Sequence, residues 1–215
     1  MAADGKPASS GPDSVRVERI LAAYNAGIER AISRIESLRV EQVLIDPQED
    51  GTTKEARAVL AYSRSRGMER EITEPGLPHM VGRYTLPSLL GPELSTEEYV
   101  VAYEGIEEEE GVFCHRLSLE ARVRDADHFD GTIWVARDRP GPVRIVGRVA
   151  DPPWPATMIG LDKAFASGPH GIWLVRRHSG EAELSLLIRK KGVRHIFYED
   201  YWLEVSADST GTYPR

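Results

Sequence analysis

The segment from Val112 to Val123 alternates with a period of two. The odd positions are mainly apolar: Phe113, His115, Leu117, Leu119, Ala121 and Val123. The even positions are mainly polar: Cys114, Arg116, Ser118, Glu120 and Arg122. Alternation over this length is typical of a β-strand with one buried and one wetter face. We therefore expect a sheet with Phe113, Leu117 and Leu119 on its buried face.

Further β-prone runs follow one another along the chain, separated by turn signals. The runs are Leu38–Ile45, Ala56–Tyr62, Tyr99–Tyr103, Thr132–Ala136, Val143–Val149, Ile172–Arg176, Glu183–Arg189 and His195–Val205. The turn signals are Asp50-Gly51, Asp130-Gly131, Pro140-Gly141, Ser179-Gly180 and Lys191-Gly192. This spacing predicts an antiparallel meander with few crossovers, so the fold class is mainly β.

One long helix is predicted at residues 15–35. Its apolar residues recur every three or four positions: Val17, Ile20, Leu21, Tyr24, Ile28, Ile32 and Ile35. Such a stripe indicates an amphipathic helix packed on the sheet. A short second helix is expected near Leu161–Ala166.

Two apolar segments rich in proline and glycine interrupt the strand pattern. They are Thr73–Thr96 and Asp151–Phe165. Both are long and apolar for solvent loops, and long loops in compact domains are usually lids or binding segments. We expect them to cover the sheet as loop or short-helix lids.

Composition limits the partners and the compartment. The chain has 215 residues and a formal net charge of −7, and its basic residues form only short pairs, so a nucleic-acid partner is not expected. No apolar run approaches the roughly 20 residues of a membrane-spanning helix. The chain is either cytoplasmic or exported; the small polar leader at residues 1–13 favours a tether left by a removed export signal, and hence the periplasm or cell envelope.

Searching for chemistry yields no catalytic residue, metal ligand or cofactor site. Cys114 and His115 are adjacent in a strand and point to opposite faces, so a thiol–imidazole pair is not expected. The aspartates at 125, 127 and 130 miss the spacing of a calcium-binding EF-hand loop. The glutamates from Glu107 to Glu110 are expected to form a solvated hairpin tip. A catalytic site built from residues that are scattered along the chain has no local sequence motif.

Two longer segments resemble the LolA family of periplasmic lipoprotein carriers, with its relatives LolB and RseB. Residues 37–75 follow the helix and carry an arginine-rich, proline-terminated stretch with Arg64, Arg66, Arg70 and Pro75. Residues 113–147 have a long strand, a turn, a strand with Trp134, and a proline before the next strand. The resemblance covers most of residues 15–205 and rests on the order of the elements.

The resemblance implies an incomplete β barrel whose apolar concave interior holds acyl chains beneath lids. Its candidate lining residues are Tyr62, Tyr99, Tyr103, Phe113, Leu117, Trp134 and Ile145. The implied domain spans residues 14–206, with a tail at 207–215.

The implied function is non-catalytic binding of lipid or lipoprotein acyl chains in the envelope, as in lipoprotein sorting to the outer membrane. Two alternatives stay open: an RseB-like stress sensor that acts through protein contacts with an envelope membrane protein, and an enzyme with an unrecognised site. On composition alone, a solid hydrophobic core is the favoured account of the tryptophans and other apolar residues.

Overall fold

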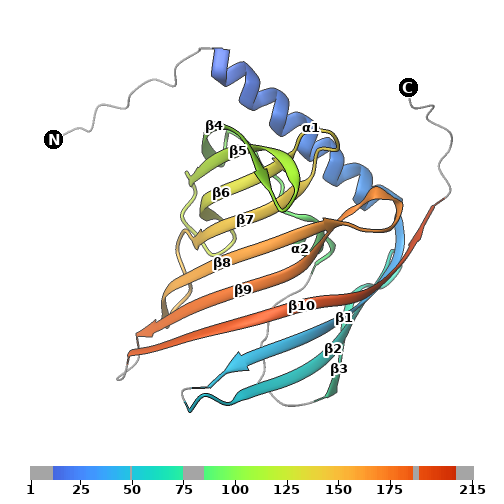
Figure 1. The fold of residues 1–215 in the computed structure, drawn as a ribbon, viewed down its shortest axis with the longest axis vertical. Coiled ribbons are helices and arrows are strands. Elements are labelled where there is room, and N and C mark those ends of the chain that lie inside the picture. Colours follow the sequence, from blue (N-terminus) through green and yellow to red (C-terminus); the bar gives the residue numbers. More distant parts are fainter. Residues whose placement is uncertain (1–11, 49, 75–84, 186–188, 207–215) are drawn as a thin grey trace.

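Ten strands form one continuous antiparallel sheet in the computed structural model, which describes residues 12–206 apart from 49, 75–84 and 186–188 (Figure 1). The strands are β1 Ile35–Pro47, β2 Thr53–Ser63, β3 Gly67–Glu74, β4 Tyr99–Glu109, β5 Val112–Ala121, β6 Phe129–Ala136, β7 Pro142–Val149, β8 Ala156–Ser167, β9 Trp173–Ser185 and β10 Arg189–Val205. Their order in the sheet is β3-β2-β1-β10-β9-β8-β7-β6-β5-β4. The expected leader and tail lie largely outside the described residues, so the domain boundaries stay a prediction.

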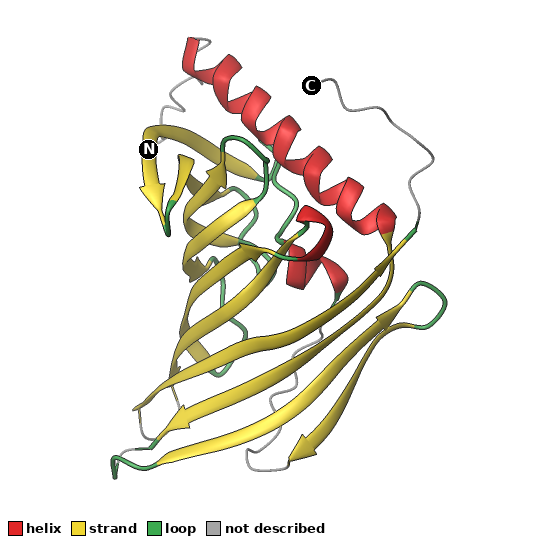
Figure 2. Cartoon of the chain, turned by 45° about the vertical axis from the view of Figure 1, so that its right-hand side comes forward, coloured by secondary structure: helices red, strands yellow, loops and turns green. Residues whose placement is uncertain are grey.

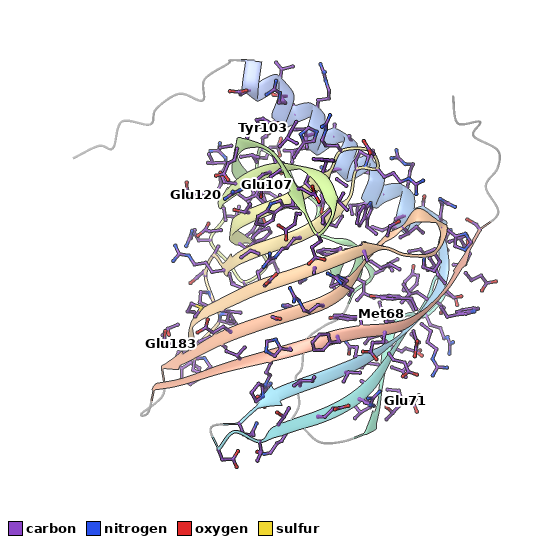
Figure 3. The ribbon with its side chains drawn as sticks, viewed as in Figure 1. Met68, Glu71, Tyr103, Glu107, Glu120 and Glu183 are labelled. Atoms are coloured by element: carbon purple, nitrogen blue, oxygen red, sulfur yellow. The ribbon has the colours of Figure 1, made fainter. Side chains whose placement is uncertain are left out.

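The sheet is curved but not closed, because β3 and β4 are its two edges although they follow one another in the chain. Figure 3 shows Met68 on β3 and Tyr103 on β4 far apart, one near each edge. The pairing of β1 with β10, for example Leu44 with Ile196, joins the two halves of the meander. The incomplete antiparallel barrel expected from the sequence is therefore confirmed.

The helix α1, Pro12–Arg34, lies across the concave side of the sheet (Figure 2). Its predicted stripe is buried at Val17, Ile20, Leu21, Tyr24 and Ile28. The prediction of this helix is confirmed, although Ile35 already belongs to β1. Burial of one apolar face against the sheet, more than local propensity, holds such a helix in place.

A short helix, α2, occupies Leu86–Leu90 within the first proline-rich segment. Thr85 and Ser88 form a capping box at its start, in which each side chain bonds the backbone N–H of the other residue. Its leucines are buried beneath α1 and against β9. A short helix is thus present where a lid is expected; residues 75–84 of this segment lie outside the described part.

The prediction that the second segment, Asp151–Phe165, forms a lid is wrong for most of its length. Residues 156–167 form β8, which pairs with β7 on one side and β9 on the other, so the helix expected at Leu161–Ala166 does not form. Pairing on both sides satisfies the backbone hydrogen bonds of the segment and overrides its irregular composition. Only residues 151–155 remain a loop, with Trp154 exposed.

Several glycines predicted as turns lie inside strands. Ser179-Gly180 falls within β9 and Lys191-Gly192 within β10, so both strands are longer than expected. Gly131 lies within β6, where an added Cβ would come within 2.2 Å of the Val146 carbonyl oxygen. Glycine is needed there because two strands approach closely, and not for a turn. Gly51 does lie in the predicted turn between β1 and β2, with a φ of 80°.

The alternation of β5 is confirmed at its centre and wrong at its end. Leu117, Leu119 and Ala121 are buried on the side of the core. Phe113 is 61% exposed, because it lies opposite Glu108 beside the β4–β5 turn and beyond the packed core. The buried face of this strand therefore begins after Phe113.

The run from Glu107 to Glu110 leads into the expected hairpin turn and Glu108 is exposed, but its other three glutamates also make ion pairs across the sheet. Glu107 pairs with Arg116 and accepts a hydrogen bond from the Trp134 indole. Glu109 lies 2.9 Å from Arg144, which also forms a two-pronged pair with Asp162. Glu110 pairs with Arg176. The twist of the sheet brings these strands within reach of the β4–β5 hairpin, which local sequence does not reveal.

Candidate functional site

Strand register assigns each side chain to the concave face, which we define as the face toward α1 and α2. Leu117, Ile133 and Ile145 lie directly opposite one another on β5, β6 and β7 and belong to the core cluster. Continuing from Ile145, the same row passes through Lys163 on β8 and His178 on β9. It ends with Ile196, Leu44 and Ala56 on β10, β1 and β2.

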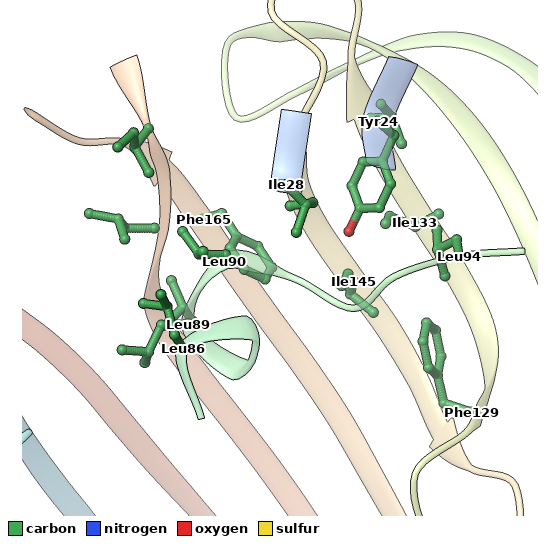
Figure 4. Packing of buried hydrophobic residues seen from close by; sticks show 14 of the residues in the cluster. Tyr24, Ile28, Leu86, Leu89, Leu90, Leu94, Phe129, Ile133, Ile145 and Phe165 are labelled. Atoms are coloured by element: carbon green, nitrogen blue, oxygen red, sulfur yellow. The ribbon is translucent and has the colours of Figure 1, made fainter. Parts of the chain in front are cut away.

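The half of this face beneath the helices is filled by side chains. Figure 4 shows Tyr24 and Ile28 of α1 and the leucines of α2 against Ile133, Ile145 and Phe165 of the sheet. Three of the predicted lining residues, Tyr99, Leu117 and Ile145, are at most 2% exposed in this cluster. They support the helices, and a role of theirs in lining a ligand stays a prediction.

The other four predicted lining residues are scattered. Tyr62 is half-buried, opposite Leu38 and Met68. Tyr103 lies beneath the Arg16 guanidinium, 4.9 Å from its ring centre, and Phe113 is exposed.

Trp134 needs a correction, because it lies on the convex face. It packs in a separate small cluster with Cys114 and Val143, and the guanidinium of Arg116 lies 5.6 Å from its ring centre. Its position is one residue along β6 from Ile133, and adjacent strand residues point to opposite faces. Trp134 therefore does not reach the concave space.

Beyond α2, the concave face continues over the distal ends of the long strands (Figure 2). We call this part the far half; its residues include Ile159, Leu161, Lys163, His178 and Gly180. All five keep part of their surface accessible. An added Cβ at Gly180 would meet no atom closer than 3.7 Å, so space remains above β9. The far half is therefore the candidate binding surface.

Polar groups also lie on this face. Arg194 on β10 and Asp46 on the neighbouring strand β1 form an ion pair, with their side-chain atoms 3.4 Å apart. Gln42 is 0% exposed, and neither of its amide atoms has a hydrogen-bond partner in the structure. Such an unsatisfied amide is rare in a buried position and calls for a physical reason.

Lys163 and His178 form a cross-strand pair in the far half. Burial lowers the pKa of the Lys163 amine. Burial, followed by the nearby charge of Lys163, lowers the pKa of His178 to about 4, against a smaller opposing effect of Asp162. At neutral pH the histidine is uncharged, so any positive charge of the pair lies on the Lys163 amine.

Sequence reasoning missed both residues, because Lys163 fell in a segment predicted as an irregular lid. The alternate positions Ile159, Leu161 and Lys163 could have indicated that this lysine lies in a strand. Those residues alternate with Gly160 and Asp162, which places the lysine on the apolar face of a strand.

Cys114 is unsuited to nucleophilic chemistry. It is fully buried on the convex side, and its thiol lies 3.3 Å from the Val112 carbonyl oxygen. Burial raises the pKa of the thiol to about 11. The thiolate is therefore scarce at neutral pH.

A separate hollow, away from the far half, lies between residues 92–99 and the β5–β6 loop. It has a volume of about 510 Å³ and is lined by Pro92, Glu93, Ser95, Glu97, Glu98, Tyr99, Asp127 and His128. The hydrogen bond that the His128 ring donates to the Asp125 carboxylate is the main cause that raises the pKa of His128. Its acidic, polar lining does not suit an acyl chain.

The described residues contain neither a candidate metal site nor a candidate membrane-spanning helix. Over residues 12–206, leaving out the gaps, no cluster of three or more His, Cys, Asp or Glu side chains could hold a metal ion. In the same part of the chain, neither helix is long and apolar enough to cross a membrane.

Comparison with known proteins identifies the fold. No protein-family model and no curated protein matches the chain. A putative outer membrane lipoprotein-sorting protein domain from Vibrio parahaemolyticus is similar with a TM-score of 0.50 and 9% identity, covering 88% of this chain and 95% of that one. A LolA superfamily protein from Nitrosomonas europaea gives a TM-score of 0.49 and 14% identity, covering 87% and 93%. The MucA/MucB complex of Pseudomonas aeruginosa gives 0.30 and 10%, covering 85% and 93%. The first likeness shows the fold alone, which is the incomplete antiparallel barrel that the sequence predicts.

Proposed function

We propose that this protein binds lipid or the acyl chains of a lipoprotein, without catalysis, in the far half of its concave face. One observation carries the proposal. The sheet extends beyond the area that α1 and α2 fill, and it leaves Ile159 and Leu161 part-exposed beside the space above Gly180. An acyl chain laid on such a surface gains about 0.8 kcal/mol for each methylene removed from water.

The cell envelope is the proposed place of action. Its support is the name of the structural neighbour from Vibrio parahaemolyticus, a putative lipoprotein-sorting domain of the outer membrane. Lipoproteins and other envelope proteins are the corresponding partners. An RseB-like sensor remains the alternative within this fold, and it requires protein contacts instead of a bound lipid.

Two glycines on neighbouring strands provide a matched test. Gly180 faces the concave side opposite Leu161, whereas Gly160 faces the convex side opposite Glu181. Both accept a Cβ at ordinary contact distances of 3.7 Å or more, and neither has a positive φ. Gly180→Trp should therefore fill the proposed binding space without straining the backbone, and Gly160→Trp should leave that space empty.

The measurement is saturable binding of a fluorescent fatty acid, displaced by unlabelled lipid. Gly180→Trp should weaken binding about tenfold or more, and Gly160→Trp should bind as the wild type does. Co-purified lipid, seen by native mass spectrometry of the wild type, should be lost in the first variant alone. Non-saturable binding, or equal binding by all three proteins, would contradict the proposal and favour the sensor.

A further inference from the structure

The side chain of Lys163 projects into an apolar environment. Its cross-strand neighbours are Ile145 on β7 and His178 on β9, and Ile145 belongs to the buried core cluster. Along its own strand, Leu161 and Phe165 belong to or pack against the same cluster. The primary amine is therefore placed on the concave face, in the far half and next to the filled half.

Among the described residues, no acidic group neutralises this amine. In the part of the chain that the structure describes, Lys163 forms neither an ion pair nor a hydrogen bond. The neighbouring carboxylate, Asp162, lies on the convex face and is held by Arg144 and Arg177. Arg194, the other cation that we placed on the concave face, does have a partner in Asp46. Charges in apolar surroundings are normally paired, so an unpaired one requires an explanation.

His178 lies directly beside the lysine and can supply a second contact. Cβ atoms of opposite residues in antiparallel strands are about 5 Å apart, so the two polar groups can reach one bound atom group. A Cβ at Gly180 would lie 4.0 Å from Nε2 of His178, which places the ring next to the space above Gly180. A neutral imidazole donates a hydrogen bond and adds no charge.

We propose that Lys163, with His178 beside it, binds the acidic headgroup of the amphiphile whose acyl chain lies in the far half. The inference rests on the proposed function and names its ligand class. One cation matches one negative charge, so the headgroup is a carboxylate, as in a fatty acid, or a singly charged phosphodiester, as in an acidic phospholipid. A hydrogen-bonded ion pair in apolar surroundings is stronger than one in water.

Ligands with the same acyl chain and different headgroups test this proposal. The probes are hexadecanoate, its methyl ester, dihexadecanoyl phosphatidylglycerol and hexadecylamine, each measured by displacement of a fluorescent fatty acid. The wild type should prefer the acid to the ester by about tenfold or more. Whether phosphatidylglycerol or the free acid binds more tightly distinguishes the two sources of the negative charge.

Lys163→Met removes the charge and keeps an unbranched side chain of similar length. This variant should bind acid and ester equally, and its affinity for the ester should not fall. Arg148→Met is the control, since it removes one positive charge from the convex face. Lys163→Glu should reverse the preference, so that hexadecylamine binds more tightly than the acid.

The outcomes separate the two proposals. Equal binding of acid and ester by the wild type, or an unchanged preference in Lys163→Met, would overturn the headgroup proposal and leave lipid binding intact. If none of the probes binds saturably, the proposed function fails and the headgroup site fails with it.

Discussion

Asn25 of α1 and Leu94 are joined by two hydrogen bonds, from the Asn25 amide to the Leu94 carbonyl oxygen at 2.6 Å and from the Leu94 N–H to the Asn25 side chain at 3.1 Å. One side chain therefore satisfies both backbone groups of a residue that is fully buried. The Tyr24 hydroxyl adds a third bond, to the Pro92 carbonyl oxygen. These bonds hold the segment that follows α2 beneath the long helix.

Asn25→Ala should lower the free energy of unfolding by about 2–4 kcal/mol, because it leaves a buried N–H and a buried C=O without partners. Urea denaturation measures this loss. Ser33→Ala is the control, since that hydroxyl bonds the Arg30 carbonyl oxygen at an exposed site. Its effect should stay within about 0.5 kcal/mol. A similarly small effect of Asn25→Ala would show that the segment is held by apolar packing alone.

The two faces of β5 can be tested at two residues of the same strand. Leu117→Ala should cost about 2–5 kcal/mol, because it opens a cavity in the core at a residue that is 0% exposed. Phe113→Ala should cost less than about 1 kcal/mol, because the ring is already exposed. Thermal or urea unfolding of both variants checks the difference. Equal losses would contradict the register of the strand.

Periodic features of the sequence predicted the main elements correctly. The stripe of α1 and the centre of β5 each repeat a simple period over several turns or residues, so local pattern is sufficient. The pairing of β1 with β10 could not be predicted from local pattern, because it joins residues as distant as Ile35 and Val205. The resemblance to a known family implied an incomplete barrel, but it did not specify this pairing.

Errors about the site have a different origin. Ile133, Trp134, Val135 and Ala136 are all buried, so β6 shows no alternation, and its sequence does not tell which residues face the concave side. The convex position of Trp134 depends instead on Glu107, Arg116 and Arg144, which come from other strands. Lys163 was missed for a related reason: its significance depends on neighbours in β7 and β9 that only the folded sheet brings together.

Gln42→Leu should raise the free energy of unfolding by about 1–3 kcal/mol. The substitution removes two buried polar atoms that lack hydrogen bonds and keeps a side chain of similar size. Gln48→Leu is the matched control, because that amide donates to the Asp46 carbonyl oxygen at 3.0 Å and its loss should be neutral or destabilising. Chemical denaturation measures both. If Gln42→Leu is destabilised, the buried amide must gain a partner in solution.

His178 should make the free protein less stable as the pH falls from about 6.5 to about 4. Its pKa is about 4 in the folded state and near 6.5 in the unfolded chain, because burial and the charge of Lys163 disfavour the imidazolium. Between these pH values the imidazole is protonated in the unfolded chain but not in the folded one. Protonation therefore favours the unfolded chain, and the free energy of unfolding falls as the pH drops below 6.5. The loss is at most about 3 kcal/mol, since each pKa unit corresponds to 1.36 kcal/mol.

His178→Gln should therefore weaken the acid destabilisation relative to the wild type, as measured by urea unfolding at pH 7, 6, 5 and 4. His128→Gln should act in the opposite direction. The pKa of His128 is raised, mainly by its hydrogen bond with Asp125, so its stabilisation is complete below about 6.5 and is lost as the pH rises through its folded value. Removing His128 should thus steepen the loss of stability on acidification. Each variant is compared with the wild type, because all carboxylates are common to the proteins and only Asp125 loses a hydrogen-bond partner, in His128→Gln. A pH profile of His178→Gln that runs parallel to that of the wild type would show that His178 is solvated like an ordinary surface histidine.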